Sequence, residues 1–199
     1  MPHPLVYDAI VLAGGRSSRM GDVDKLEIVV DGCTLLVHTL AAVADAGRVV
    51  VVGPRGLPGV PADALRTQED PPFSGPAAAM GAGLAALGDD AADHVLVVVA
   101  DVPRVGEVVD ALLVALASHP GRDGVVTRSA DGRRQPLLAA HRTAALRAAL
   151  VAHEPLADLS ATRVISGLDL LDVDLAAEVV ADIDTPDDLR RTAEEPRHG

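Results

Sequence analysis

The sequence predicts an α/β fold in which a mostly parallel sheet lies between two layers of helices, and three observations support this. Short runs rich in Val recur along the chain, segments with helical spacing of apolar residues lie between them, and Pro and Gly separate the two kinds of segment. Near-continuous apolar runs are typical of strands covered on both faces. Strands that alternate with helices indicate parallel neighbours joined by right-handed crossovers.

Four apolar runs are predicted to be strands, and they cover residues 7–13, 48–53, 94–100 and 124–127. Helices are predicted over residues 34–46, 77–87 and 105–118, and from 143 to a stop at Pro155. A last helix is expected to open on Thr185 and Pro186, with two Asp in its first turn. No internal repeat divides the 199 residues. A single domain over residues 1–192 is therefore expected, followed by a flexible tail over 193–199.

Composition excludes several classes of function. The formal net charge is −12, whereas nucleic acids and anionic membranes are bound by clustered Lys and Arg. Cys33 is the single cysteine, so neither an internal disulfide nor a multi-cysteine zinc site is possible. No signal segment is recognisable, and the apolar runs are shorter than the ~20 residues that span a bilayer. We expect a cytoplasmic protein that binds neither nucleic acid nor membrane.

The stretch LAGGRSSRMGDVDK, residues 12–25, is the strongest candidate for an anion-binding loop. It follows the first predicted strand and contains glycines, two arginines and Lys25, the only lysine in the chain. Glycine lets backbone N–H groups approach phosphate oxygens closely, and a compact ammonium suits a phosphate as a point charge. The stretch matches neither the Walker A pattern nor GxGxxG. A solvated basic turn is the alternative interpretation.

A carboxylate emerges from a second predicted strand. Asp101 directly follows the run VLVVVA, and open α/β sheets bind ligands at the carboxyl ends of their strands. Mg²⁺ prefers carboxylate and phosphate oxygens, so one Asp with phosphates and waters could complete its coordination. The alternative is that Asp101 only caps the loop that contains Pro103.

The stretch LAGGRSSRMGDVDK resembles the signature LAGGxSxRMGxxDK of nucleotidyltransferases that join an NTP to a phosphate acceptor and release pyrophosphate. Within that superfamily the chain is most similar to the molybdenum cofactor guanylyltransferases, which attach GMP to molybdopterin. A Gly-Pro motif at Gly75, an Asp-x-Pro motif at Asp101 and a closing xDxTPxDL segment follow in the family's order. The resemblance implies a three-layer αβα fold with a Rossmann-like sheet of the nucleotide-diphospho-sugar transferase type.

The resemblance also implies roles for individual residues. Arg19, Lys25 and Asp101 would be catalytic, with Arg19 and Lys25 holding the triphosphate and neutralising the charge on the leaving pyrophosphate. The remaining nucleotide-binding positions would be Leu12, Ala13, Gly14, Gly15, Gly53, Asp70 and Gly75. Arg134 and Gln135, before a further strand, would receive the acceptor, because guanidinium groups suit its terminal phosphate. Solvated surface arginines are the alternative there.

The metal expected from the resemblance is Mg²⁺, held by Asp101 and by Asp184. The family commonly carries an Asn-x-Asn-Thr type segment where this chain has Asp182 and Asp184. Asp at these positions also resembles the cytidylyl-transferring relatives, although the chain contains no Asn anywhere. Alternatively, Asp184 only stabilises the start of a helix through the helix dipole.

The base is less constrained by the sequence than the reaction. Gly15 in LAGG resembles the guanylyl enzymes, whereas the cytidylyl relatives more often show LAAG, so GTP and molybdopterin are the expected substrates. The alternatives are CTP-dependent modification of molybdopterin, another NTP transferase acting on a small phosphorylated acceptor, and an inactive nucleotide-binding adaptor. Transient contacts with other cofactor-biosynthesis proteins or with molybdoenzymes are also expected.

Overall fold

The computed structural model describes residues 5–14, 28–30, 32–129 and 131–181. Its centre is a seven-stranded sheet with the strand order β5-β4-β1-β6-β8-β7-β9. The strands are β1 (Tyr7–Leu12), β4 (Val49–Val52), β5 (Leu65–Thr67), β6 (His94–Val99), β7 (Gly124–Arg128), β8 (Arg134–Arg142) and β9 (Leu170–Asp174). A separate two-stranded hairpin pairs β2 (Val29–Val30) with β3 (Cys33–Thr34).

All strands of the large sheet run in one direction except β8, which is antiparallel to its neighbours β6 and β7. We call the side where the parallel strands end the carboxyl edge and the opposite side the amino edge. Because β8 is reversed, it begins at the carboxyl edge. The mostly parallel sheet predicted from the sequence is confirmed, while the reversal of β8 was not predicted.

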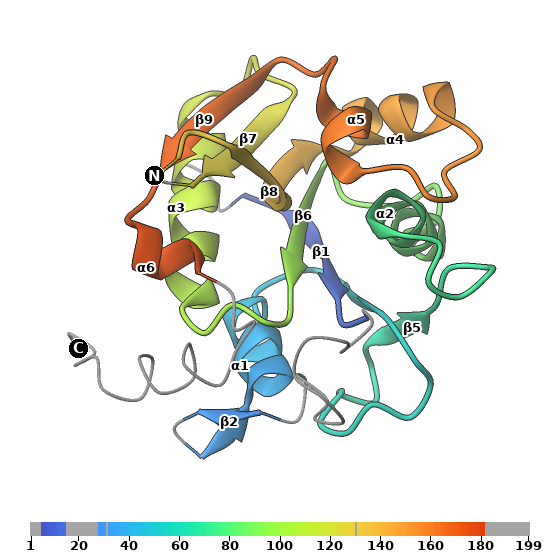
Figure 1. Cartoon of the computed structure of the whole chain (residues 1–199). Coiled ribbons are helices and arrows are strands. Elements are labelled where there is room, and N and C mark those ends of the chain that lie inside the picture. The colour runs from blue at the N-terminus through green and yellow to red at the C-terminus, as the bar shows by residue number, and fades with distance from the viewer. Residues whose placement is uncertain (1–4, 15–27, 31, 130, 182–199) are drawn as a thin grey trace.

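Helices cover both faces of the sheet, as Figure 1 shows. On one face lie α1 (Leu35–Ala42), α3 (Val105–Ser118) and α6 (Ala177–Val180). On the other lie α2 (Pro76–Leu87), α4 (Thr143–Ala152) and α5 (Ala161–Ile165). Each helical layer closes its own core of buried apolar side chains against the sheet. This is the predicted three-layer αβα arrangement.

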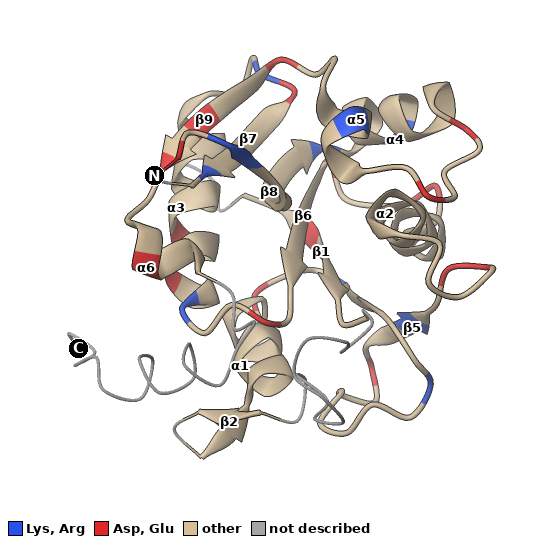
Figure 2. Ribbon diagram, viewed as in Figure 1, with Lys and Arg blue, Asp and Glu red and all other residues tan. Residues whose placement is uncertain are grey.

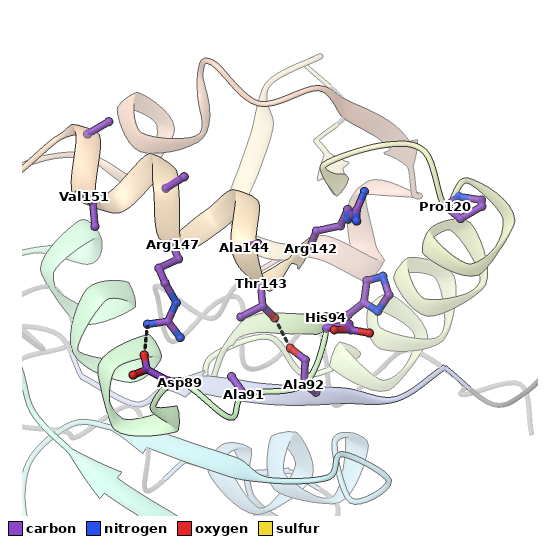
Figure 3. A pocket seen from close by; sticks show the side chains of 13 residues that line it. Asp89, Ala91, Ala92, His94, Pro120, Arg142, Thr143, Ala144, Arg147 and Val151 are labelled. Carbon is purple, nitrogen blue, oxygen red and sulfur yellow. Dashed lines mark hydrogen bonds and ion pairs between the residues drawn. The ribbon is translucent and has the colours of Figure 1, made fainter.

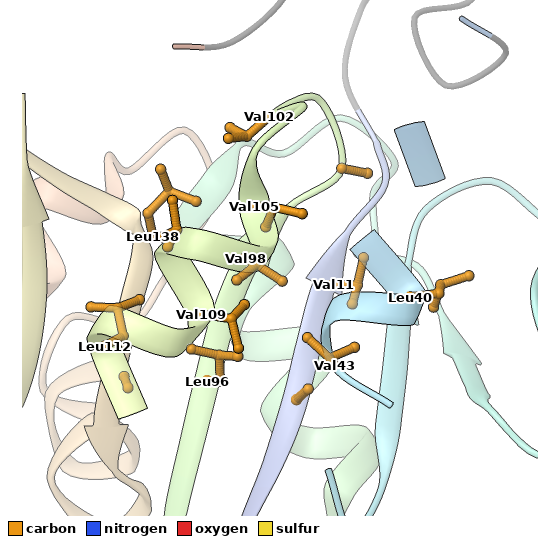
Figure 4. Packing of buried hydrophobic residues seen from close by; sticks show 14 of the residues in the cluster. Val11, Leu40, Val43, Leu96, Val98, Val102, Val105, Val109, Leu112 and Leu138 are labelled. Carbon is orange, nitrogen blue, oxygen red and sulfur yellow. The ribbon is translucent and has the colours of Figure 1, made fainter. Parts of the chain in front are cut away.

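The cores are packed almost entirely from aliphatic side chains. In the α1/α3 layer, Leu96 and Val98 of the sheet lie beside Val109 of α3, and Val11 lies toward Leu40 and Val43 at α1 (Figure 4). Val and Ile are stiff at χ1 and pack well on a pleated surface, which explains why the Val-rich runs form the central strands.

The first helix is shorter than predicted. Thr34 caps it, because its Oγ1 accepts a hydrogen bond from Val37 N at 3.3 Å. The helix ends at Ala42 although the prediction extended it to Ala46. After Ala42 the backbone forms tighter turns, in which Ala46 N donates to Val43 O at 3.0 Å. The helical spacing of apolar residues therefore continues beyond the end of the helix.

Several short elements were not predicted. They are the strands β5 and β9, the hairpin β2–β3, and the helices α5 and α6. β5 is only three residues long and β9 alternates apolar residues with Asp, so neither has the continuous apolar run used to find strands. The expected helix at Thr185 lies outside the described residues. No helix in the described ranges is long and apolar enough to cross a membrane.

At the amino edge, one guanidinium joins three segments of the chain. Arg48 donates to Asp8 Oδ2 at 2.9 Å, to Leu87 O at 3.0 Å and to Asp90 O at 2.7 Å. Asp8 is only 2% exposed and also accepts from Ala92 N at 2.9 Å. A buried carboxylate is tolerated when it is paired and hydrogen-bonded in this way. The network therefore fixes the start of β1 to β4 and to the loop before β6.

Arg and Asp side chains also pair across the outer strands β7, β8 and β9, where blue and red segments lie close together in Figure 2. Arg128 Nε lies 2.7 Å from Asp174 Oδ1, and Arg134 Nε lies 2.6 Å from Asp172 Oδ1. Arg122 forms a further pair with Asp169, just before β9. These pairs join β9 to the strands on its inner side.

Candidate nucleotide site at the carboxyl edge

Three loops begin next to one another at the carboxyl edge. Leu12 is opposite Val52 on one side and Val99 on the other. Just beyond these pairs, Ala13 N donates to Val52 O at 2.8 Å and Ala100 N donates to Leu12 O at 3.1 Å. The loops that follow β4 and β6 therefore each start within hydrogen-bonding distance of the end of β1, at the edge where open α/β sheets bind ligands.

Gly53 and Gly14, both predicted to bind nucleotide, differ in what their missing side chains permit. A Cβ on Gly53 would lie 2.4 Å from Ala13 O, so only glycine lets the loop after β4 pass the loop after β1. A Cβ on Gly14 would meet nothing closer than Gly53 Cα at 3.7 Å. Gly53 is thus required by packing, whereas a Cβ on exposed Gly14, which lines a cavity, would make only ordinary van der Waals contacts.

A cavity of about 230 Å³ lies between these loops and the start of α2, and we call it the glycine pocket. It brings together three of the predicted nucleotide-binding residues, Leu12, Gly14 and Gly75. The other lining residues are mostly apolar: Val52, Glu69, Phe73, Pro76, Ala79, Val99 and Leu137. The start of the signature stretch and the Gly-Pro motif, far apart in the chain, therefore line one pocket.

The wall of the glycine pocket before α2 is a tight loop. Glu69 Oε1 accepts from Phe73 N at 3.0 Å, and Ser74 Oγ donates to Pro71 O. Gly75 has φ +93°, a conformation that favours glycine, and Pro76 follows as the first residue of α2. Because α2 starts here, its N-terminal residues Pro76 and Ala79 line the pocket.

Asp70 lines a different hollow from the one that holds Gly14. It is exposed and lies with Gly53 in an adjacent hollow of about 600 Å³. Glu69 lines both this hollow and the glycine pocket. The structure thus places Asp70 beside the glycine pocket, and its contact with nucleotide stays a prediction.

Asp101 lies at the same edge as Gly14. Val99 of β6 is paired with Leu12 of β1. Asp101 follows Val99 by two residues, and Gly14 follows Leu12 by two residues. The side chain of Val102 is 1% exposed and packs in the α1/α3 core, which fixes the turn that carries Asp101 (Figure 4). Asp101 is half-buried, and α3 begins four residues later.

The turn after β6 offers the Asp101 carboxylate, and the described residues contain no complete metal cage. No group of three or more His, Cys, Asp or Glu side chains in the described ranges could hold a metal. Mg²⁺ is usually held by one or two carboxylates together with phosphate oxygens and waters. A single Asp101 fits a Mg²⁺ that arrives with a nucleotide. Four predicted residues, Gly15, Arg19, Lys25 and Asp184, lie outside the described residues.

Arg134 and Gln135 do not line the glycine pocket. They are the first residues of β8, and not a loop before it as predicted, and Gln135 is opposite Thr127. Arg134 pairs with Asp172 and donates to Leu170 O at 3.3 Å. Its guanidinium therefore has a structural role in holding β9, and its acceptor-binding role stays a prediction.

Comparison with known proteins defines the family. The family model described as the MobA-like NTP transferase domain matches residues 9–169, from β1 to the residue before β9. The chain belongs to this family. A "probable molybdenum cofactor guanylyltransferase" from Chloroflexus aggregans is 32% identical over 206 residues, covering 96% of this chain and 95% of the relative. A molybdenum cofactor guanylyltransferase from Shewanella putrefaciens is 30% identical over 139 residues, covering 68% of this chain and 69% of the relative.

Solved structures confirm the fold of this MobA-like domain. Molybdopterin-guanine dinucleotide biosynthesis protein A from Archaeoglobus fulgidus matches with a TM-score of 0.67 and 20% identity, covering 94% of this chain and 97% of the other. The 2-C-methyl-D-erythritol 4-phosphate cytidylyltransferase from Thermus thermophilus matches with a TM-score of 0.61 and 24% identity, covering 94% and 98%. Enzymes named for different bases thus share this fold.

The site of this MobA-like domain contains residues that sequence reasoning missed. Glu69 and Phe73 line the glycine pocket, yet neither belongs to the quoted motifs. Phe73 could have been noticed as the only Phe in the chain, beside the Gly-Pro motif. Leu137 reaches the pocket from a bulge: Val126 pairs with Ala139 but Thr127 pairs with Gln135. Nothing local in the sequence indicates that bulge apart from Pro136, which cannot donate to the ladder.

A larger hollow of about 850 Å³ lies at the amino edge (Figure 3). His94, Arg142 and Arg147 line it, and Arg147 Nη1 lies 3.9 Å from Asp89 Oδ1. None of the predicted site residues lines this hollow. The candidate site of the MobA-like domain therefore rests on the meeting of Leu12 and Gly14 with Gly75, and not on the size of a cavity.

Proposed function

We propose that this chain transfers GMP from GTP to the terminal phosphate of molybdopterin and releases pyrophosphate. One observation carries this proposal: Leu12 and Gly14 of the signature stretch line the same pocket as Gly75. The names of the relatives from Chloroflexus aggregans and Shewanella putrefaciens supply the substrates.

In the proposed reaction, a phosphate oxygen of the acceptor attacks the α-phosphorus of GTP in line. A new oxygen–phosphorus bond forms, the bond to the oxygen bridging the α- and β-phosphates breaks, and pyrophosphate leaves. No nucleophile from the protein is needed, because the attacking phosphate is already ionised at neutral pH. The protein contributes positioning and electrostatic stabilisation, which are the main aids to phosphoryl-type transfer.

Each part of the site has a role in this proposal. The backbone of Leu12, Ala13 and Gly14 lines the base and ribose, and Gly14 allows close approach because it lacks a side chain. Arg19 and Lys25 hold the triphosphate. Asp101, with Asp184, would hold Mg²⁺, which neutralises phosphate charge when it is bound. Arg134 and Gln135 would lie on the acceptor side, because β8 begins at the carboxyl edge.

The cytoplasm is the proposed compartment. Cys33 is a free, exposed thiol. An exposed thiol of this kind persists in a reducing compartment. Fractionation of the source cells would test this point.

Product analysis tests the proposed function directly. The protein is incubated with molybdopterin, Mg²⁺ and GTP or CTP, and products are identified by mass. We expect the guanine dinucleotide of molybdopterin and an equal amount of pyrophosphate with GTP, and no product when the metal is chelated. A cytidine product would contradict the choice of base. Nucleotide binding without pyrophosphate release would favour the inactive adaptor.

A further inference from the structure

The Glu69 carboxylate lines the glycine pocket. We propose that it accepts hydrogen bonds from N1–H and the 2-amino group of guanine, while the Phe73 ring stacks on the base. This inference rests on the proposed function, because it assumes that a nucleotide base enters the glycine pocket. Glu69 would then be the side chain that selects guanine, a choice that the proposed backbone contacts of Leu12 to Gly14 leave open.

Glu69 is the one polar side chain among the described residues that line the glycine pocket. The rest of the lining is apolar or glycine. An apolar wall accepts the flat faces of any base, so it does not discriminate between bases. Discrimination in such a pocket falls to the polar group that the base edge can reach.

The Glu69 side chain is also held in a fixed position. It is half-buried, and its Oε1 accepts from Phe73 N at 3.0 Å. A carboxylate has two oxygens and about four acceptor positions, so this bond leaves acceptor capacity for a ligand. Glu69 lines the glycine pocket and also two neighbouring hollows, one shared with Gly53 and one beside α2 and α4.

The chemistry of the bases makes a carboxylate selective for guanine. Guanine presents two adjacent donors, N1–H and the 2-amino group, which match the two oxygens of a carboxylate. Cytosine presents one amino donor beside two acceptors, and adenine one amino donor beside an acceptor. A carboxylate repels those acceptors, and a buried acceptor that loses its donors costs binding energy. Reading the Watson–Crick edge with stacking on an aromatic ring is a general mode of base recognition.

Phe73 supplies the stacking surface. The residue is 49% exposed although it lines the glycine pocket, and its φ is +65°. This backbone conformation is unfavourable for a bulky side chain and is retained mostly where function requires it. Stacking on an aromatic ring does not depend on which base stacks, so Phe73 adds affinity and Glu69 adds selectivity.

Equilibrium binding of GTP, ITP and CTP, each with Mg²⁺, tests this division of roles by calorimetry. ITP differs from GTP only by the missing 2-amino group. For the wild-type protein we expect ITP to bind roughly tenfold weaker than GTP, and CTP roughly a hundredfold weaker. In Glu69→Gln, GTP binding should fall by roughly 10- to 100-fold, and the GTP/ITP ratio should approach one. Gln still accepts from Phe73 N, so the fold should persist.

Two further variants complete the design. Phe73→Leu should weaken all three nucleotides by a similar factor, roughly tenfold, with their ratios unchanged. Glu178→Gln is the matched control, because Glu178 is exposed on α6 and does not line the glycine pocket. It should bind all three nucleotides as the wild type does.

The outcomes separate this inference from the proposed function. If the wild type prefers GTP and Glu69→Gln keeps the wild-type ratios, the role of Glu69 is wrong while the proposed function stands. If the wild type binds GTP selectively but forms no product with molybdopterin, the proposed function is wrong while the role of Glu69 stands. A wild type that prefers CTP, or that binds no nucleotide, overturns both.

Discussion

The amino and carboxyl edges of the sheet are held together by different interactions around β1, β4 and β6. At the amino edge, the guanidinium of Arg48 bonds to buried Asp8 and to two backbone carbonyls. Backbone hydrogen bonds join these strands at both edges, as from Gly47 N to Tyr7 O at the amino edge and from Ala13 N to Val52 O at the carboxyl edge. Fixed charges thus stabilise the side away from the candidate site, and glycine and main chain shape the site itself.

This difference has a physical reason. A charged side chain that is already paired with a neighbour has little left to offer a ligand, whereas exposed main-chain N–H groups and missing side chains leave room for phosphate and base. The Arg48 network can therefore be tight without affecting binding. The comparison predicts that changes at the amino edge alter stability, and that changes at the carboxyl edge alter chemistry.

The largest effect is expected from Asp101→Ala. Turnover should fall by about a thousandfold or more, because the group proposed to hold the metal against the triphosphate is lost. Lys25→Ala should have a comparable effect. Pyrophosphate release measures the loss, and the melting temperature should stay close to that of the wild type. Asp110→Ala, an exposed change on α3, is the control and should keep full activity. Near-full activity in the Asp101 variant would remove its catalytic assignment.

Asp8→Ala should give the opposite result. Removing this buried carboxylate leaves Arg48 and Ala92 N without their partner, and we expect the free energy of unfolding to fall by about 3 kcal/mol. Nucleotide affinity below the melting range should not change. Asp90→Ala is matched to it, because Asp90 pairs with the same guanidinium but its side chain is 87% exposed.

The Asp90 variant should lose less than about 1 kcal/mol. Urea denaturation of both variants measures the difference. If Asp8→Ala and Asp90→Ala lose equal free energy of unfolding, the burial of Asp8 does not determine how much its ion pair with Arg48 stabilises the fold.

His141 should make stability depend on pH. It lies fully buried on β8, near the amino edge, and its ring nitrogens have no hydrogen-bond partner among the described residues. Burial lowers the pKa of His141 from 6.5 to about 4, against a smaller opposing effect of Asp123. Between these values the unfolded state binds the proton more readily. The free energy of unfolding should therefore fall by about 3 kcal/mol as the pH drops from 6.5 to 4.

His141→Leu should remove this contribution while keeping an apolar side chain of similar size in the core. Urea denaturation at several pH values gives the slope for both proteins. If the slope between pH 4 and 6.5 is the same in the variant, the buried imidazole is not its source.

The smallest effects are expected from substitutions of two glycines at the carboxyl edge. Gly53→Ala places a Cβ 2.4 Å from Ala13 O, so the two loops must separate, and we expect a loss of about 1–3 kcal/mol of stability. Gly14→Ala has room in the fold and should cost less than about 0.5 kcal/mol. It should nevertheless weaken GTP binding several-fold, since the methyl group enters the space beside the pocket. Thermal unfolding and calorimetry on both variants distinguish the roles.

Much of the fold was predictable because the central strands are short apolar runs, several of them rich in Val. β1, β4, β6 and β7 were all predicted to within two residues of their ends. β5 and β9 were missed because a short strand such as Leu65–Thr67 depends on pairing with its neighbour β4 more than on its own sequence. The reversal of β8 also depends on pairing across the sheet, which no local pattern contains.

The candidate site was partly predictable for a similar reason. Leu12, Gly14 and Gly75 lie in motifs, and the structure brings them to one pocket. Glu69 and Phe73 reach the same pocket only because the loop before α2 turns back on itself, with Phe73 N bonded to Glu69 Oε1. Such a turn is set by three-dimensional contacts, so residue type alone did not identify either side chain.

The outermost strands of the described sheet affect whether the protein can associate with itself. An exposed strand edge can pair with another copy of the chain, and a Val-rich sheet is especially open to this. β5 is too short to offer much edge, and β9 carries Asp172 and Asp174, which an incoming strand would have to desolvate. Replacing both Asp with Val should make the protein aggregate, as light scattering would show. The charges on β9 would then prevent the edge of this sheet from pairing with the sheets of other copies and forming fibres.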